Sequence, residues 1–243
     1  MKFSILIPAR FNSSRFKGKP LKKIHGKEMV IRVAEQCAKA VKRNSIFIVT
    51  DSKKIQKKVN QNNFNSIMSP KNIKTGTDRI AFASRKMKSK IFINVQGDEP
   101  LIQPIDIKKI IEAKKKYFNH VICGYANESN YSKIKDKNII KAVTAKNGDL
   151  IYFSRSVIPG KKKLNHKIFK KQVCIYAFSK KQLQKFSVHK KSNLESMEDI
   201  ELLRFMELGI KIKLIKVSPS ISVDIPKNLI EVEKYLSLKK NNT

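Results

Sequence analysis

The residues that most clearly indicate chemistry in this chain follow a single apolar run. Residues 91–95 (Ile-Phe-Ile-Asn-Val) have the composition of a buried strand, and Gly97, Asp98 and Glu99 come soon after it. In an open α/β sheet, ligands bind beyond the carboxyl ends of the strands. A carboxylate there can hold Mg²⁺, which prefers oxygen ligands and shares them with substrate phosphates. The segment predicts metal-assisted phosphate chemistry, with Asp98 as the metal ligand and Glu99 in a structural salt bridge.

A second carboxylate, Asp224, ends a short apolar run near the C-terminus, two residues before Pro226. Taken alone it is typical of a helix cap, because proline is favoured in the first turn of a helix. Paired with Asp98, it would complete a metal site.

A basic loop follows the first apolar run. Residues 8–20 (Pro-Ala-Arg-Phe-Asn-Ser-Ser-Arg-Phe-Lys-Gly-Lys-Pro) carry the cations Arg10, Arg15 and Lys19. The loop is not a Walker A motif, because it lacks the first glycine and has Pro20 where a Ser or Thr would hold Mg²⁺. A basic surface loop is the alternative, but its place after the first strand predicts that it binds a triphosphate.

Two further segments offer polar groups at the ends of elements. In residues 75–79 (Thr-Gly-Thr-Asp-Arg), Thr77 is expected to cap a helix whose exposed N–H groups meet a base or a phosphate, although an ordinary cap has the same pattern. Arg155 follows an apolar run and is suited to an acidic substrate. A helix over 193–208 would place Glu195, Glu198 and Glu201 along one side, with Glu195 in a capping box. The four histidines have no metal-ligand spacing and receive no catalytic role.

Strands that alternate with helices must position these groups. Apolar runs at 2–8, 46–49, 64–68 and 91–95 predict strands, and helical periodicity marks 29–37, 78–87 and 104–117. This alternation predicts a doubly wound, mostly parallel Rossmann-like α/β sheet. The later half has strand-like runs with few helices between them, at 120–126, 139–145, 150–153, 173–178 and 210–217. It predicts a mixed sheet or a β-rich substrate lobe, with helices at 193–208 and 226–238.

Composition narrows the class of protein. The 243 residues are 41% hydrophobic, which suits one domain with a sizeable core. The net charge of +34 invites a nucleic-acid-binding interpretation, but the excess is mostly lysine spread along the chain without a basic stripe. The three scattered cysteines indicate reduced core thiols in a cytoplasmic protein, not disulfides or a zinc site. No apolar run is long enough to cross a membrane, so no membrane insertion is expected.

In this order along nearly the whole chain, the motifs resemble those of the 3-deoxy-manno-octulosonate cytidylyltransferase (CMP-Kdo synthetase) family. They are Ile-Pro-Ala-Arg at 7–10 with Arg15 and Gly-Lys-Pro-Leu at 18–21, Thr-Gly-Thr-Asp-Arg at 75–79, Asn-Val-Gln-Gly-Asp-Glu-Pro at 94–100, Tyr-Phe-Ser-Arg at 152–155, and Val-Asp-Ile-Pro at 223–226. The resemblance implies transfer of CMP from CTP to 3-deoxy-D-manno-octulosonate (Kdo), an acidic eight-carbon sugar, with release of pyrophosphate, for lipopolysaccharide or capsule synthesis.

The resemblance also implies roles for particular residues. The implied nucleotide-binding residues are Pro8, Ala9, Arg10, Arg15, Lys19, Thr75, Gly76, Thr77, Arg79 and Gln96. Catalysis would fall to Arg10, Lys19 and Asp98, and Mg²⁺ would lie on Asp98 and Asp224. The implied sugar-binding residues are Arg155, Lys162, Gln172, Tyr176 and Glu201. By the same resemblance, a nucleotide part over about 1–120 precedes a substrate and dimerisation part over about 121–220, and the protein is a homodimer.

Two positions depart from the family pattern on the sugar side. Gln172 stands where the family usually has a histidine, and Leu202 stands where it usually has a glutamine. Losing a cation and an amide changes how a carboxylate or hydroxyl is held. The alternatives that stay open are therefore CMP transfer to an 8-amino analogue of Kdo or to a sialic-type acid.

Overall fold

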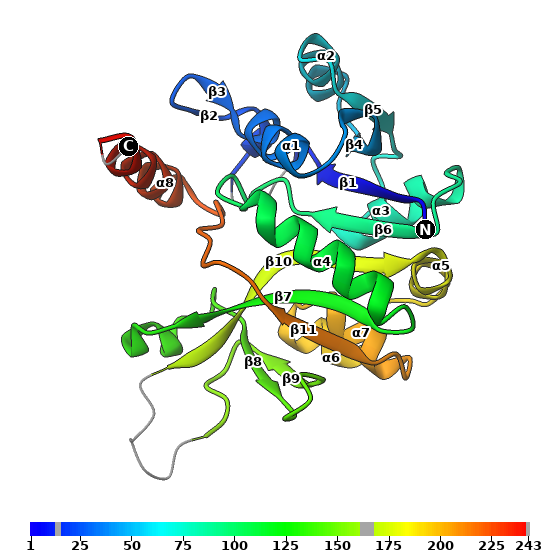
Figure 1. Cartoon of the computed structure of the whole chain (residues 1–243), viewed down its shortest axis with the longest axis vertical. Coiled ribbons are helices and arrows are strands. Elements are labelled where there is room, and N and C mark those ends of the chain that lie inside the picture. Colours follow the sequence, from blue (N-terminus) through cyan, green and yellow to red (C-terminus); the bar gives the residue numbers. More distant parts are fainter. Residues whose placement is uncertain (13–15, 161–167, 242–243) are drawn as a thin grey trace.

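A central sheet with helices on both faces forms the body of the computed structural model, which describes residues 1–12, 16–160 and 168–241 (Figure 1). The strand order is β11-β7-β10-β6-β1-β4-β5, with β8 and β9 added beside β10 and a separate β2-β3 pair. The strands are β1 (Phe3–Ala9), β2 (Lys23–Ile24), β3 (Lys27–Glu28), β4 (Ile46–Thr50), β5 (Asn65–Met68), β6 (Ile91–Val95), β7 (Val121–Glu128), β8 (Lys141–Thr144), β9 (Leu150–Ser154), β10 (Phe169–Ser179) and β11 (Ile212–Lys216). The α-helices are α1 (Met29–Ala40), α2 (Lys53–Gln61), α3 (Gly76–Arg85), α4 (Pro104–Lys116), α5 (Lys180–Val188), α6 (Asn193–Glu198), α7 (Leu202–Glu207) and α8 (Pro226–Asn241).

The sheet is mostly parallel, as the sequence predicts, and β10 is the strand that reverses. β1 is parallel to β4 and β6, and β4 is parallel to β5. β10 lies antiparallel between β6 and β7, with Tyr176 opposite Asn94 and Gln172 opposite Tyr125. The start of β10 therefore lies at the same edge of the sheet as the carboxyl ends of β1 and β6, where the sequence predicts ligands.

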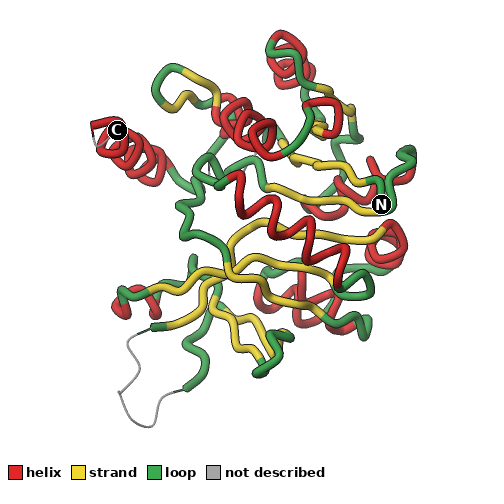
Figure 2. The backbone as a smooth tube through the Cα atoms, in the orientation of Figure 1, coloured by secondary structure: helices red, strands yellow, loops and turns green. Residues whose placement is uncertain are grey.

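Helices cover both faces of this sheet (Figure 2), and a separate core lies between the sheet and the helices on each face. On one face, α1, α2 and α4 cover strand residues such as Ile5 and Ile93. On the other face, α3, α5 and α7 cover Leu6 and Phe92. Adjacent residues of β1 and β6 thus enter different cores, because successive strand side chains point to opposite faces. Both faces of these strands are buried, which is why the sequence shows continuous apolar runs.

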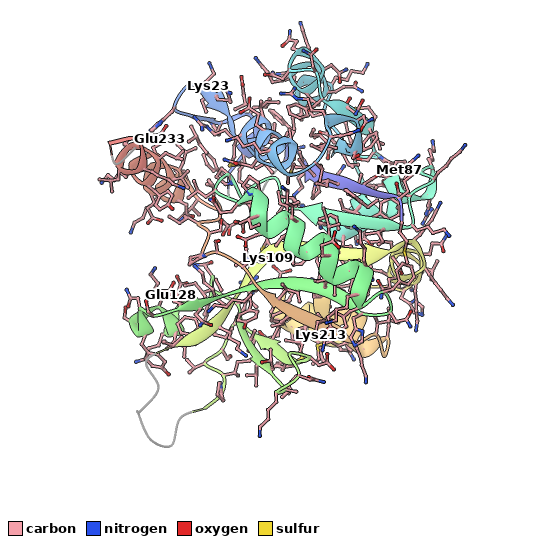
Figure 3. The ribbon with its side chains drawn as sticks, in the orientation of Figure 1. Lys23, Met87, Lys109, Glu128, Lys213 and Glu233 are labelled. Carbon is pink, nitrogen blue, oxygen red and sulfur yellow. The ribbon has the colours of Figure 1, made fainter. Side chains whose placement is uncertain are left out.

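The last helix extends from this body and packs beside the β2-β3 hairpin. Lys23 of the hairpin and Glu233 of α8 mark the neighbouring elements in Figure 3. The backbone N–H of His25 donates to Glu233 at 3.0 Å, and Val232 is fully buried against Ile24 and Met29. Among the described residues, none of the helices is long and apolar enough to cross a membrane.

Several local predictions were wrong, each for a physical reason. Asp51, soon after the apolar run at 46–49, is a plausible cap for the next helix by its residue type, but Ser52 caps α2 by accepting from the backbone N–H of Ile55, and Asp51 pairs with Arg79. The single helix expected over 193–208 breaks into α6 and α7, because Asp199 adopts a left-handed conformation (φ 50°). Helix α5 and the β2-β3 hairpin were not predicted at all; α5 begins with a capping box at Ser179.

Candidate active site

An open pocket of about 680 Å³ lies at the edge where β1 and β6 end and β10 begins. Nearly all the described residues that the sequence predicts for the site line it, with the exception of Thr77. They are Pro8, Ala9, Arg10, Lys19, Thr75, Gly76, Arg79, Gln96, Asp98, Arg155, Gln172, Tyr176, Glu201 and Asp224. The predicted residues Arg15 and Lys162 lie outside the described residues, so their roles stay predictions.

Two carboxylates converge on one ammonium group in this pocket. Lys19 Nζ lies 2.6 Å from Asp98 Oδ2 and 3.5 Å from Asp224 Oδ1. The backbone explains the convergence, because the N–H of Val223 donates to the Asp98 carbonyl at 2.9 Å and holds the two acids side by side. Burial opposes the charge on Lys19, but the two carboxylates outweigh it and raise the pKa of the ammonium.

The same arrangement suits a divalent cation. Both carboxylates face one point that already accommodates a positive charge, and carboxylate oxygen is the ligand type that Mg²⁺ prefers. Across the described residues, no group of three or more His, Cys, Asp or Glu side chains converges on a metal position. A magnesium ion on Asp98 and Asp224 would therefore take its other ligands from water and substrate phosphate, as is usual for this ion.

Glu99 has a structural role that differs from that of its neighbour Asp98, as the sequence predicts. It makes a hydrogen bond where a salt bridge was expected. Its carboxylate is 3% exposed and accepts from the hydroxyl of Ser220 at 2.5 Å. Burial, together with the charge of Asp98, raises the pKa of Glu99 to about 7. Within the part of the chain that the structure describes, this hydrogen bond takes the place of the expected salt bridge, and it fastens the 218–222 segment to the end of β6.

The first turn of α3 forms the opposite wall of the pocket. Thr75, not Thr77, caps the helix by accepting from the N–H of Asp78 at 3.0 Å. The N–H groups of Gly76 and Thr77, expected to meet the nucleotide, donate to Glu201 instead, at 3.2 and 2.7 Å. A Cβ on Gly76 would lie 3.1 Å from Gln96 Nε2, so only glycine lets α3 approach Gln96 this closely.

The two arginines on the nucleotide side have different surroundings. Arg10 is exposed at the pocket, where it donates to the Lys74 carbonyl at 3.3 Å. Arg79 is 2% exposed, and it binds Asp51 at 3.1 Å and the hydroxyl of Ser69. Arg79 thus ties α3 to the ends of β4 and β5, while its contact with the nucleotide stays a prediction.

Arg155 joins three main-chain segments on the acceptor side. Its Nε, Nη1 and Nη2 atoms donate to the carbonyls of Glu198, Lys137 and Asp199 at 2.6, 2.9 and 3.1 Å. The buried Lys141 donates in turn to the Arg155 carbonyl at 2.6 Å. The bonds that Arg155 donates use three of the five N–H groups of its guanidinium, and the recognition of an acidic group by Arg155 stays a prediction.

The remaining acceptor-side positions include the two that depart from the family pattern. Tyr176 is 7% exposed, and burial raises the pKa of its phenol well above the usual range. Gln172 has its amide 3.8 Å from Cys123 Sγ, and Leu202 is buried in the core yet lines the pocket. Lys171, which the sequence motifs do not mark, also lines the pocket, and its Nζ lies 3.5 Å from Glu128 Oε2. Its position directly before Gln172 was the available signal.

Comparison with known proteins decides the family. The model of a family described as cytidylyltransferase matches residues 4–212, which is most of the chain. The chain belongs to the cytidylyltransferase family. The resemblance to its 3-deoxy-manno-octulosonate branch is confirmed by a 3-deoxy-manno-octulosonate cytidylyltransferase of Fusobacterium nucleatum, which is 38% identical over 100% of this chain and 99% of the relative.

Other relatives of this cytidylyltransferase differ in the acceptor that their names carry. An 8-amino-3,8-dideoxy-manno-octulosonate cytidylyltransferase of Shewanella baltica is 35% identical over 98% of this chain and 100% of the relative. A solved structure of a CMP:2-keto-3-deoxy-manno-octonic acid synthetase complexed with CTP superposes with a TM-score of 0.92 at 32% identity, over 98% of this chain and 100% of that one. The enzyme class and fold are therefore confirmed, whereas relatives of similar identity carry two acceptor names.

Proposed function

We propose that this enzyme transfers CMP from CTP to 3-deoxy-D-manno-octulosonate, giving CMP-Kdo and pyrophosphate. The observation that supports it best is the pair of carboxylates on Lys19 beside the α3 wall, in a pocket with room for a nucleotide and a sugar. The anomeric hydroxyl oxygen forms a bond to the α-phosphorus and loses its proton. The bond between the α-phosphorus and the oxygen that bridges to the β-phosphorus breaks, and pyrophosphate leaves with that oxygen.

Different residues of the chain would bind the two substrates, offset the charge on the triphosphate and hold the metal ion. Arg10 and Lys19 would hold the triphosphate and offset the charge that develops on it. Asp98 and Asp224 would hold Mg²⁺, which supplies Lewis-acid polarisation of the phosphate and orientation of the hydroxyl when bound. Thr75, Gly76 and Gln96 would contact the cytidine, and Gln172, Tyr176 and Glu201 would contact the sugar.

A substrate panel tests the function and its nearest alternatives. Pyrophosphate release is measured with CTP, Mg²⁺ and each of Kdo, 8-amino-3,8-dideoxy-manno-octulosonate and a sialic acid. We expect the highest kcat/KM with Kdo. A higher kcat/KM with the 8-amino sugar would make that sugar the preferred acceptor. No pyrophosphate release with any of the sugar acids would contradict the proposed activity.

We also propose that the enzyme acts in the cytoplasm as a homodimer through its β-rich half. The exposed large apolar side chains of this half include Ile151 on β9, Val157, and Ile168 before β10, at 55, 40 and 55%. Sedimentation is expected to give twice the mass of one chain, and the double substitution Ile151→Lys with Ile168→Lys is expected to give the single-chain mass. A monomeric parent protein would contradict this assembly.

A further inference from the structure

The first turn of α3 obtains its hydrogen-bond acceptors from two sources. The first N–H groups of a helix have no acceptor within the helix. Here the Thr75 hydroxyl supplies the acceptor for one of them, the N–H of Asp78, while the Thr75 carbonyl accepts the first regular bond of the helix, from the N–H of Arg79. Two more, the N–H groups of Gly76 and Thr77, are bound by the two carboxylate oxygens of Glu201, which lies about 125 residues later in the chain.

Glu201 belongs to the acceptor side of the pocket. It stands at the N-terminus of α7, and its neighbours Ile200 and Leu202 line the pocket beside it. A second link runs parallel to the first, because Arg204 Nη1 lies 3.4 Å from Asp78 Oδ1. Helix α7 is thus fastened to α3 at two points, both in the first turn of α3.

We propose that Glu201 is a positioning residue for the nucleotide: its carboxylate holds the Thr75–Thr77 turn in the place where CTP contacts it, before any sugar binds. The inference rests on the proposed function for the nucleotide site and assigns Glu201 a role beyond contact with the sugar. The fit is close, since a Cβ on Gly76 would lie only 3.1 Å from the Gln96 amide. A small shift of the turn would therefore displace the Gln96 amide as well, and both groups lie on the side of the pocket where CTP would bind.

The test measures CTP affinity in the absence of sugar. Isothermal titration with CTP and Mg²⁺ is expected to give a Kd about tenfold higher for Glu201→Ala than for the parent, because misplaced groups bind a ligand poorly. Glu201→Gln is expected to fall between them. Its amide oxygen can still accept from the N–H of Thr77, but its amide nitrogen is a donor and cannot accept from the N–H of Gly76.

A matched control exists on the same helix. Glu207 of α7 also binds a backbone N–H at a helix start, but that N–H belongs to Leu194 of α6, at 3.2 Å. Glu207→Ala removes a similar contact and does not touch α3. We expect it to leave the Kd for CTP unchanged, which separates the position of α3 from a general loosening of α7.

The outcomes distinguish this inference from the proposed function. An unchanged Kd for CTP in both Glu201 variants, with a raised KM for the sugar, would reduce Glu201 to a sugar ligand and overturn the inference. Tighter CTP binding would also overturn it, because Glu201 would then compete with the nucleotide for the two N–H groups. If Glu201→Ala does not fold, Glu201→Gln carries the test alone. Failure of the parent protein to bind CTP would instead count against the proposed function.

Discussion

Replacing Asp98 with Asn is expected to lower kcat about 10³-fold while the protein stays folded. The substitution removes one of the two carboxylates that face the Lys19 ammonium, at 2.6 Å, and an amide is a weak ligand for Mg²⁺. Loss of a properly held metal ion costs several kcal/mol of transition-state stabilisation. Single-turnover formation of the CMP-sugar, followed over a range of Mg²⁺ concentrations, measures the effect.

The adjacent acid provides a matched control. Glu99→Gln also removes one acidic group, one residue further on, but its amide oxygen can still accept from Ser220. It is expected to keep most of the turnover. Near-normal activity of Asp98→Asn, or an equal loss in both variants, would take Asp98 out of the metal site.

The second large effect is on stability. Arg204→Met is expected to lower the free energy of unfolding by about 3–5 kcal/mol, because it leaves the Glu195 carboxylate buried without its cation. Arg204 holds both oxygens of Glu195, at 2.6 and 2.7 Å, where the two side chains are 4 and 1% exposed. Its guanidinium also stacks on Phe186, 3.7 Å from the ring centre. Urea unfolding followed by circular dichroism measures the change.

A double variant identifies the cause of that loss. Adding Glu195→Leu to Arg204→Met removes the buried charge and is expected to recover a large part of the stability. If the double variant is as unstable as the single one, the other contacts of Arg204, which are its stacking on Phe186 and its bonds to Asp78 and to the main chain, would account for the loss, and the ion pair with Glu195 would not.

The sequence predicts the main strands of this enzyme better than it predicts the contacts inside the site. Apolar runs in β1, β4 and β6 are long enough to mark buried strands. Groups that follow β1 and β6, such as Lys19 and Asp98, reach one pocket, where they meet Asp224 from the C-terminal part of the chain. The motif order supplied the pairing of these two acids, which spacing alone does not give.

What the sequence does not reveal is which partner a charged side chain takes. Arg155 and Glu201 look like ligands for a substrate, yet in this structure they bind main-chain carbonyls and N–H groups. These bonds join segments that are distant in the chain, so no local pattern records them. The break between α6 and α7 was missed for a similar reason, because only Asp199 in a left-handed conformation marks it.

The reversed strand β10 has a consequence for how the chain assembles. The strands β1, β4 and β6 can pair among themselves within the first 95 residues, but β7 has no contact with β6 in the sheet except through β10. Such a pairing between distant segments slows folding, since loop-closure entropy is lost before the contact forms. During synthesis, strands β1, β4 and β6 can therefore pair early, while β7 waits for β10. The complete pocket, which includes Glu201 and Asp224, arises only after Asp224 has left the ribosome.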